Sequence, residues 1–149
     1  MCDRDNCRIK VFRLDGSFLR QWGTFGPGEG EGQFISPHGV AVSGEEVYVC
    51  DSANIQVFGL DGSFVRQWGT RGGEEGEFRN PRDVLVSGEE VYVCDTGNAR
   101  IQVFGLNGTF LRQWGTLGAG EGQFSCPSRM AVSGDELFVS DSNRIQIFS

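Results

Sequence analysis

The sequence predicts an all-β protein made of tandem four-stranded antiparallel sheets, and three observations support this fold class. The segment at residues 18–24 returns at 64–70 and again at 110–116, so the chain repeats itself every 46 residues. Each copy divides into short apolar runs separated by turn residues, and no helical period lasts more than one turn. Glycine is abundant, at 23 of 149 residues, and supplies the tight turns that such sheets need.

The first two strands of a copy are expected at residues 39–42 and 47–50, on either side of a Ser-Gly-Glu-Glu turn. Both runs are small or apolar at nearly every position, which indicates burial on both faces between neighbouring sheets. The run at residues 40–44 returns at 84–88 and at 131–134.

The third strand is expected at residues 55–58, where polar and apolar residues begin to alternate, and the fourth at 64–68, where the alternation is clearer. Asp61 and Gly62 between them form a strong two-residue hairpin signal. Four-stranded antiparallel units of this length, apolar inside and amphipathic at the outer edge, are typical of β-propeller blades. Within one propeller segment spanning residues 1–149, joined by long glycine-rich loops, we place the blade parts at 2–24, 34–70, 78–116 and 124–149.

One copy carries the residues of a known repeat. Residues 78–81 are Phe-Arg-Asn-Pro, and residues 91–104 hold a Val-Tyr-Val-Cys-Asp strand followed by Thr-Gly-Asn-Ala-Arg-Ile. This sequence resembles the NHL repeat, whose signature is a Phe-x-x-Pro opening, a Val-Tyr-Val-x-Asp strand and an Asp-x-x-Asn-x-Arg-Ile corner. The resemblance extends over the whole chain and implies an NHL-type propeller, commonly a six-bladed ring. The corners at 51–55 and 141–145 are two residues shorter, and the first of them lacks the arginine.

The chain is expected to hold about three blades, or half of such a ring. Residues 2–9 align with 94–101, so the first blade is expected to have only a third and a fourth strand, and the last blade lacks its fourth, which gives 13 strands. Closed propellers have four to eight blades, so two apolar blade faces would stay open. Two interpretations remain: a homodimer completes a six-bladed ring, with residues 18–22 of the partner as the missing fourth strand, or the chain is a fragment of a longer ring.

Charge and cysteine content narrow the function classes. The net charge of −7 argues against nucleic acid as a partner, because an acidic chain repels phosphate backbones. No apolar leader or membrane-length stretch is present, so we expect a cytoplasmic protein that binds no membrane. Among the five cysteines, Cys2, Cys50 and Cys94 share one repeat position, which Ser140 occupies in the last copy. This pattern predicts small core residues and no disulfide framework.

Several polar groups could be mistaken for catalytic or metal sites. Asp–Arg pairs recur at equivalent corners and are therefore expected to be structural ion pairs: Asp95–Arg100, Asp141–Arg144 and Asp3–Arg8. The acidic loops lack the Asp/Asn alternation of calcium loops, so we expect a solvated rim, no metal and no cofactor: Glu29, Glu31, Glu74, Glu75, Glu77 and Glu121. His38 is the sole histidine, whereas the amidating lyases that resemble this fold use several around a metal. We therefore expect no enzymatic activity.

The candidate binding site lies where the repeat is broken, directly after the loop prolines. In each copy two residues follow the proline and are expected to begin the innermost strand at the mouth of the central channel. These pairs are His38 and Gly39, Arg82 and Asp83, and Ser128 and Arg129. The family usually has glycine at the second position, which only Gly39 keeps. We call the five residues other than Gly39 the channel-mouth residues: His38, Arg82, Asp83, Ser128 and Arg129. Both recognition of a ligand and neutral drift explain such variation at equivalent positions.

The leading hypothesis is a protein-interaction scaffold that binds a peptide or protein at the channel mouth. The resemblance also implies substrate recruitment for a ubiquitin ligase, although no RING spacing is present in this chain. The second hypothesis is RNA binding through one face, carried by Arg71, Arg79, Arg82, Arg100 and Arg129. The third is a metal-assisted hydrolase or lyase. Turns on the opposite face carry acidic residues that either attract a basic partner or maintain solubility: Glu45, Glu46, Glu89, Glu90, Asp135, Glu136, Asp15 and Asp61.

Overall fold

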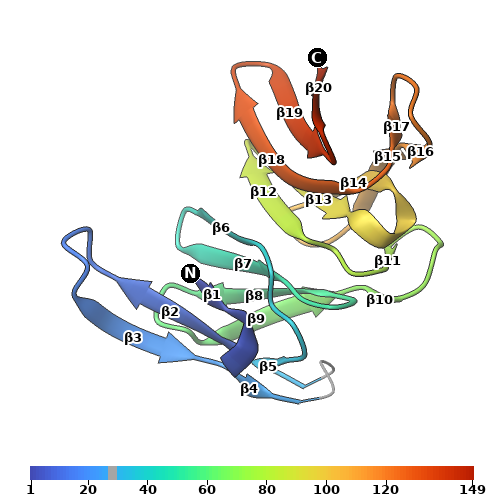
Figure 1. Ribbon diagram of the computed structural model, residues 1–149. Helices are drawn as coiled ribbons and strands as arrows, with labels where there is room; N and C mark the ends of the chain where they lie inside the picture. The colour runs from blue at the N-terminus through green and yellow to red at the C-terminus, as the bar shows by residue number, and fades with distance from the viewer. Residues whose placement is uncertain (27–29) are drawn as a thin grey trace.

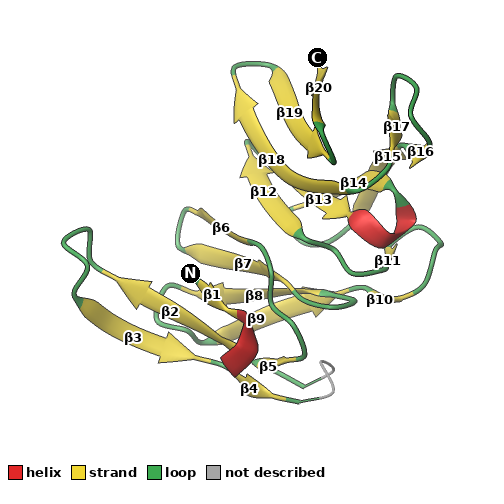
Figure 2. Ribbon diagram, in the orientation of Figure 1, coloured by secondary structure: helices red, strands yellow, loops and turns green. Residues whose placement is uncertain are grey.

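The computed structural model describes residues 1–26 and 30–149, which form four antiparallel sheets that follow one another along a curved row (Figure 1). The sheets appear in sequence order, one per repeat, and we call them the first to the fourth blade. Helical structure in the described residues is limited to two 3-10 turns, η1 (Arg4–Asn6) and η2 (Thr96–Asn98) (Figure 2). No helix in this part of the chain is long and apolar enough to cross a membrane.

The second and third blades are complete, with four strands each. The second blade consists of β6 (Val40–Ser43), β7 (Glu46–Cys50), β8 (Ile55–Gly59) and β9 (Phe64–Trp68). The third consists of β12 (Asp83–Ser87), β13 (Glu90–Asp95), β14 (Arg100–Gly105) and β15 (Phe110–Trp114). Neighbouring strands pair antiparallel in sequence order, which confirms the predicted blade.

The first and fourth blades have three strands each. The first consists of β1 (Cys2–Asp3), β2 (Arg8–Phe12) and β3 (Phe18–Trp22). The fourth consists of β18 (Pro127–Ser133), β19 (Glu136–Asp141) and β20 (Arg144–Phe148). The prediction of two strands in the first blade was therefore wrong. Only two residues of β1 pair with β2. A strand of two residues is too short to show a periodicity in the sequence.

Each glycine-rich connection holds a two-residue parallel ladder, so the predicted total of 13 strands is also too low. The ladders pair β4 (Thr24–Phe25) with β5 (Gln33–Phe34), β10 (Thr70–Arg71) with β11 (Glu77–Phe78), and β16 (Thr116–Leu117) with β17 (Gln123–Phe124). Gly69 precedes one ladder with a φ of +97°, and the ring of Phe78 occupies the space where a Cβ would lie. The repeated glycine thus lets the chain turn over a buried phenylalanine.

The apolar core lies between neighbouring blades. Ile55 and Val57 on β8 are fully buried against Phe78 and Val84 of the third blade. A tryptophan of each preceding blade packs on a phenylalanine of the next, with ring centroids 5.7 Å apart for Trp22 and Phe58, 5.8 Å for Trp68 and Phe104, and 5.6 Å for Trp114 and Phe148. One repeated contact thus explains the repeated aromatic residues.

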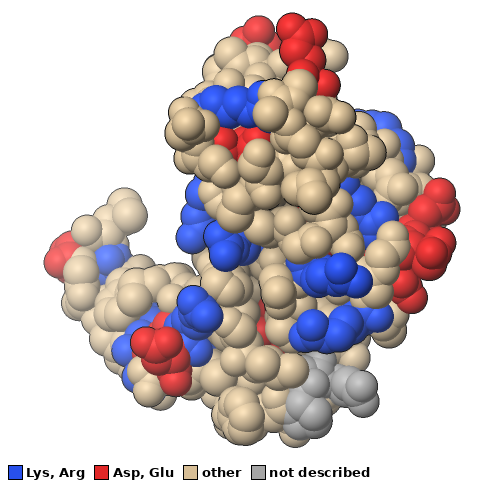
Figure 3. Space-filling model, turned by 45° about the vertical axis from the view of Figure 1, so that its right-hand side comes forward, with Lys and Arg blue, Asp and Glu red and all other residues tan. Residues whose placement is uncertain are grey.

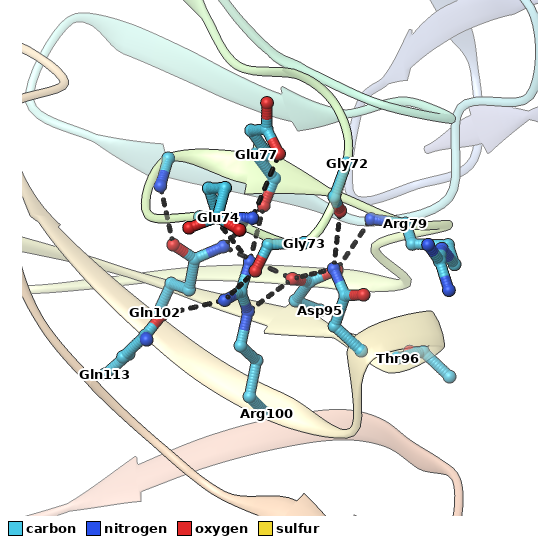
Figure 4. A network of polar contacts seen from close by, with 12 residues as sticks. Gly72, Gly73, Glu74, Glu77, Arg79, Asp95, Thr96, Arg100, Gln102 and Gln113 are labelled. Carbon is cyan, nitrogen blue, oxygen red and sulfur yellow. Dashed lines mark hydrogen bonds and ion pairs between the residues drawn. The ribbon is translucent and has the colours of Figure 1, made fainter.

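The corner between β13 and β14 fastens the third blade to the loop that precedes it (Figure 4). The buried carboxylate of Asp95 accepts hydrogen bonds from Arg100 Nε, Asn98 Nδ2 and the backbone N–H of Arg79, each at 2.8 Å. The other N–H groups of Arg100 donate to the Gln113 side chain and to backbone carbonyls of Gly73, Glu74 and Glu77. These hydrogen bonds therefore order the loop at residues 72–77, which consists of glycine and glutamate and has no apolar side chains to pack.

The predicted structural ion pairs are confirmed at three corners. Asp95–Arg100 joins atoms 2.8 Å apart, Asp3–Arg8 2.8 Å and Asp141–Arg144 3.0 Å. The corner that lacks the arginine works without one. Among the described residues Asp51 forms no ion pair, and its carboxylate accepts the backbone N–H groups of Ile35 and Ser36.

The shared cysteine position is a core position, as predicted. Cys50 and Cys94 are buried and Cys2 is half-buried, and none of them forms a disulfide. Burial raises the pKa of the Cys94 thiol to about 12 and that of Cys2 to about 11. These thiols therefore stay protonated at neutral pH and are poor nucleophiles.

Candidate functional site at the channel mouth

The innermost strands β6, β12 and β18 lie side by side and bring the channel-mouth residues of three blades together. A Cβ atom on Gly39 would lie 2.7 Å from the Cα atom of Asp83, so only glycine allows this approach. The Asp83 carboxylate in turn accepts a hydrogen bond from the backbone N–H of Met130 at 2.7 Å. His38, Asp83 and Arg129 thus lie at or next to the starts of three neighbouring inner strands.

Arg82, Asp83 and Arg129 are in direct contact. Arg129 Nη1 donates to the backbone carbonyl of Arg82 at 2.8 Å and lies 3.7 Å from a carboxylate oxygen of Asp83. Burial raises the pKa of Asp83, and the charge of Arg129 partly opposes this. The Arg129 side chain remains 62% exposed, and Arg82, which contacts Cys126 Sγ at 3.5 Å, is exposed as well. Both guanidinium groups are therefore accessible to a ligand.

His38 connects this group to an arginine that sequence reasoning missed. Its Nε2 atom lies 3.3 Å from Ser36 Oγ, which accepts a hydrogen bond from Arg4 Nε at 2.9 Å. Burial lowers the pKa of His38 below its ordinary value of 6.5, and the charges of Arg4, Arg82 and Arg129 lower it further. The positive charges of three arginines thus oppose protonation of one imidazole.

The repeat contained a signal for Arg4. In the alignment of residues 2–9 with 94–101, Arg4 matches Thr96, whose Oγ1 donates to the carbonyl of Pro127 at 2.6 Å. This corner position therefore lies beside the channel mouth of the following blade. Because η1 places Arg4 there, the first blade supplies a fourth element to the site.

Ser128 is at the predicted position, but its hydroxyl already has a partner. The Oγ atoms of Ser128 and Ser140 lie 3.1 Å apart, and Ser140 Oγ also contacts the carbonyl of Arg129. Ser140 stands where Cys50 and Cys94 stand in the other blades, so this pair is a local feature of the fourth blade. The accessible groups of the site are Arg4, His38, Arg82 and Arg129.

Arg100 cannot serve the predicted RNA-binding face. Its side chain is buried and its N–H groups are used within the corner network, as shown above (Figure 4). Arg71 and Arg79 are exposed, and in Figure 3 the basic side chains form several separate groups on the face in view. Five arginines were predicted to lie near one face, but the loop over Arg100 removes that side chain from the surface.

The opposite face is less acidic than the sequence suggested. Arg66 pairs with Glu46 and Arg112 with Glu90, at 2.7 Å and 2.6 Å respectively. Hydrogen bonds from Arg112 lower the pKa of Glu90 to about 2. Two of the eight predicted acidic groups are therefore neutralised inside their own blades.

Metal binding has little structural support in the described residues. None of their His, Cys, Asp and Glu side chains gather in a group of three or more that could hold an ion. Glu77 of the acidic loops accepts the backbone N–H of Glu74 at 2.9 Å and so caps its own loop. Glu29 lies outside the described residues.

The electrostatic environment of His38 can be tested by titration. Because the folded-state pKa lies below the unfolded value, the unfolded chain binds more protons in the window below pH 6.5. The contribution to stability is therefore fully present above pH 6.5 and is lost as the pH falls through the folded-state pKa. We expect the ring NMR signals of this sole histidine to titrate below pH 6.5, and the Arg82→Gln variant to titrate at a higher pH than the parent. A titration at or above pH 6.5 in the parent would contradict the lowered pKa of His38, and an unchanged titration in the Arg82→Gln variant would contradict the contribution of Arg82.

Comparison with known proteins gives the repeat type and the fold. NHL repeats match at residues 34–60 and 78–104, which cover the first three strands of the second and third blades apart from Gly105 at the end of β14. No curated protein matches the chain.

Solved structures are similar in fold at low identity. A virginiamycin B lyase from Staphylococcus aureus is 16% identical over 75% of this chain and 40% of its own, with a TM-score of 0.54. An exported-protein candidate from Bacteroides fragilis is 16% identical over 96% of this chain and 40% of its own, with a TM-score of 0.62. A 6-phosphogluconolactonase candidate from Bacteroides uniformis is 17% identical over 94% of this chain and 46% of its own, with a TM-score of 0.61.

The chain thus spans less than half the length of these structures, and at such identity the likeness concerns the fold alone. The repeat matches lie in the two complete blades, and the repeated sequence, the antiparallel sheets and the structural neighbours all agree. The chain is an all-β, propeller-type segment that carries NHL repeats.

Proposed function

We propose that this chain is a binding protein whose channel mouth holds an acidic segment of a peptide or protein partner. One observation carries the proposal: on a chain whose net charge is −7, Arg129 donates to the carbonyl of Arg82, and Arg4 donates to Ser36, whose hydroxyl contacts His38. A cationic cluster on an acidic protein is a local feature that overall composition does not explain. Carboxylates on a partner would complement it.

The chemistry of the cluster suits carboxylates. A guanidinium group presents N–H donors in a planar fork that matches the two oxygens of a carboxylate. Arg82 and Arg129 use only part of their donors within the chain. Arg82 contacts Cys126, and Arg129 donates to the Arg82 carbonyl and pairs with Asp83 at 3.7 Å. The supporting backbone lies in or next to the paired inner strands, so little ordering is needed when a ligand binds.

RNA is the second candidate ligand, and the structure favours it less. Arg100 is used internally, and exposed Glu74 and Glu75 lie in the same loop as Arg71. Phosphate backbones would meet these carboxylates together with the net negative charge of the chain.

We also propose binding in preference to catalysis. Ser36 Oγ lies near His38 Nε2, as in a nucleophile–base pair, but it also accepts a hydrogen bond from Arg4. A catalytic pair of this kind needs a third group to orient the imidazole. Among the described residues no carboxylate forms a hydrogen bond with His38. The site therefore resembles an anion-binding cluster, which in a longer protein would recruit a substrate, including one for a ubiquitin ligase.

The test is a titration of a fluorescein-labelled oligoglutamate peptide, followed by anisotropy, against the parent chain and the Arg82→Glu/Arg129→Glu variant. Because two attractive charges become repulsive, we expect affinity to fall at least about tenfold in the variant. Oligolysine and oligouridine of equal length serve as comparison probes. The peptide should bind more tightly than either of them at moderate salt.

The Arg71→Glu/Arg79→Glu variant is the matched control, because it makes the same change in net charge at exposed arginines that are not among the channel-mouth residues. We expect it to bind oligoglutamate within about twofold of the parent. Equal losses in the two variants would show that only the overall charge matters and would overturn the proposal. Preferential binding of oligouridine, falling steeply with salt, would favour the RNA alternative.

A further inference from the structure

One acidic side chain, Asp83, lies among the arginines of the channel mouth. It occupies the repeat position that Gly39 has in the second blade and Arg129 in the fourth, so a carboxylate here belongs to the third copy alone. Its Oδ1 atom lies 3.0 Å from the place that a Cβ atom on Gly39 would take. Because β12 lies between β6 and β18, the surroundings of Asp83 come from three neighbouring blades.

This carboxylate has no cation of its own chain within hydrogen-bond distance. Its Oδ2 atom accepts the backbone N–H of Met130 at 2.7 Å. The nearest positive group in the part of the chain that the structure describes is Arg129, whose Nη1 atom is 3.7 Å from Oδ1, which is too long for a hydrogen bond. The corner pair Asp95–Arg100, by comparison, joins atoms 2.8 Å apart. Asp83 therefore keeps the capacity to accept a hydrogen bond from a positive group of a ligand.

Burial makes this arrangement costly for the chain by itself. The Asp83 side chain is only 15% exposed, and burial raises its pKa although the Met130 N–H and the charge of Arg129 oppose the shift. Its partner across the β12–β13 ladder, Cys94, is a buried thiol with a pKa of about 12 and supplies no positive charge. A partly desolvated carboxylate without a close cation lowers stability, so the packing of the blades does not explain its presence.

Asp83 and the two neighbouring arginines together determine which ligand fits the channel mouth. A purely anionic group that reaches Arg82 or Arg129 also meets the negative charge of Asp83, which is next to one arginine in sequence and 3.7 Å from the other. A ligand with an ammonium group close to its carboxylate avoids this repulsion. The ammonium group donates to Asp83 while the carboxylate accepts from the guanidinium groups.

We propose that the partner segment is a peptide N-terminus that begins with glutamate or aspartate, an inference that rests on the proposed function and deepens it. The α-ammonium group of the first residue donates to the Asp83 carboxylate, and the side-chain carboxylate of that residue accepts hydrogen bonds from Arg82 and Arg129. Both groups belong to one residue, so few rotatable bonds have to be fixed on binding. An internal lysine brings its ammonium group on a flexible four-carbon stem and loses more conformational freedom.

The test compares two oligoglutamate peptides, one with a free and one with an acetylated N-terminus, both labelled with fluorescein at the C-terminus. Anisotropy is measured at about pH 7, where the α-ammonium group is protonated because its pKa is about 7.7–8.0. We expect the free peptide to bind the parent chain at least about tenfold more tightly. Net charge alone predicts the opposite order, because acetylation removes a positive charge and makes the peptide more acidic.

The Asp83→Asn variant tests the assigned acceptor. Asparagine keeps an oxygen for the Met130 N–H but removes the negative charge, so the two peptides should bind this variant within about twofold of each other. Asp61→Asn is the matched control, because it makes the same change in charge on an exposed turn where the third copy naturally has Asn107. It should keep the preference of the parent for the free N-terminus.

Two further probes distinguish the sources of the ammonium group. Free glutamate carries both groups but none of the following residues, so it should compete at least about tenfold more weakly than the free peptide. Equal competition would assign the site to the amino acid and overturn the peptide partner. An acetylated peptide with lysine after the first glutamate should bind more weakly than the free peptide, and equal affinity would overturn the role of the N-terminus.

The comparison of the two oligoglutamate peptides on the parent chain needs no variant and decides first. Equal affinities would overturn this inference and leave the proposed function standing. A preference that persists in Asp83→Asn would also overturn it, because another group would then hold the ammonium group. Failure of both peptides to bind the parent chain would overturn the proposed function as well, so the two failures are distinguishable.

Discussion

Replacing Asp95 with alanine is expected to lower the free energy of unfolding by about 3–5 kcal/mol. The substitution removes the carboxylate that neutralises the buried guanidinium of Arg100 and leaves that charge without a counterion. It also removes the acceptor for the Arg79 N–H and the Asn98 side chain. A loss of this size is a large share of the 5–15 kcal/mol that is typical of a folded domain. Urea unfolding followed by circular dichroism measures it.

Asp51→Ala is the matched control for this prediction. Asp51 is equally buried at the same repeat position, but its corner has no arginine and its carboxylate accepts backbone N–H groups. Its loss should therefore cost about 1–3 kcal/mol, the penalty for unsatisfied donors without a stranded charge. Equal costs for the two substitutions would contradict the role given to the Asp95–Arg100 ion pair.

Replacing Phe104 with alanine is expected to cost about 3–5 kcal/mol as well, for a different reason. Phe104 is 1% exposed and contacts the rings of Trp68, Phe78 and Phe110, so its removal leaves a cavity between the second and third blades. The surrounding sheets are fixed by backbone ladders and can close that cavity only in part. The measurement is again urea unfolding.

Phe12 provides an internal comparison at the same repeat position. It is 40% exposed and contacts Phe18 alone among the aromatic rings of the described residues. We expect Phe12→Ala to cost about 1 kcal/mol. If the two substitutions cost the same, burial between blades does not govern stability, and the blade-on-blade core described above is wrong.

Most of the fold could be predicted from the sequence because each strand is repeated. The spacing between copies of the Arg-Gln-Trp-Gly motif set the blade length, and the hairpin signal at Asp61 and Gly62 separated the third and fourth strands. The parallel ladders were missed because each involves only two residues, such as Thr70 and Arg71, within glycine-rich loops. Their pairing depends on where the loop returns, which local sequence does not encode.

Only some of the residues of the proposed site could be identified from the sequence. Breaks in the repeat identified Arg82 and Arg129. In the structure the Arg129 side chain donates to the backbone carbonyl of Arg82 and pairs with Asp83. Arg4 was missed because it belongs to a corner and not to an inner strand. Arg100 was assigned both to a corner ion pair and to a surface tract, and only the fold of the preceding loop decides for the first.

The most direct test of the central claim is an NMR titration of the isotope-labelled chain with the oligoglutamate peptide. If the channel mouth is the binding site, the largest backbone shifts should lie at and next to His38, Arg82 and Arg129, and the His38 ring should titrate at a higher pH when the peptide is bound. The turns that carry Glu45 and Glu89 on the opposite face should not shift. Shifts centred on those turns, or spread evenly over the surface, would contradict the assignment of the channel mouth as the functional site.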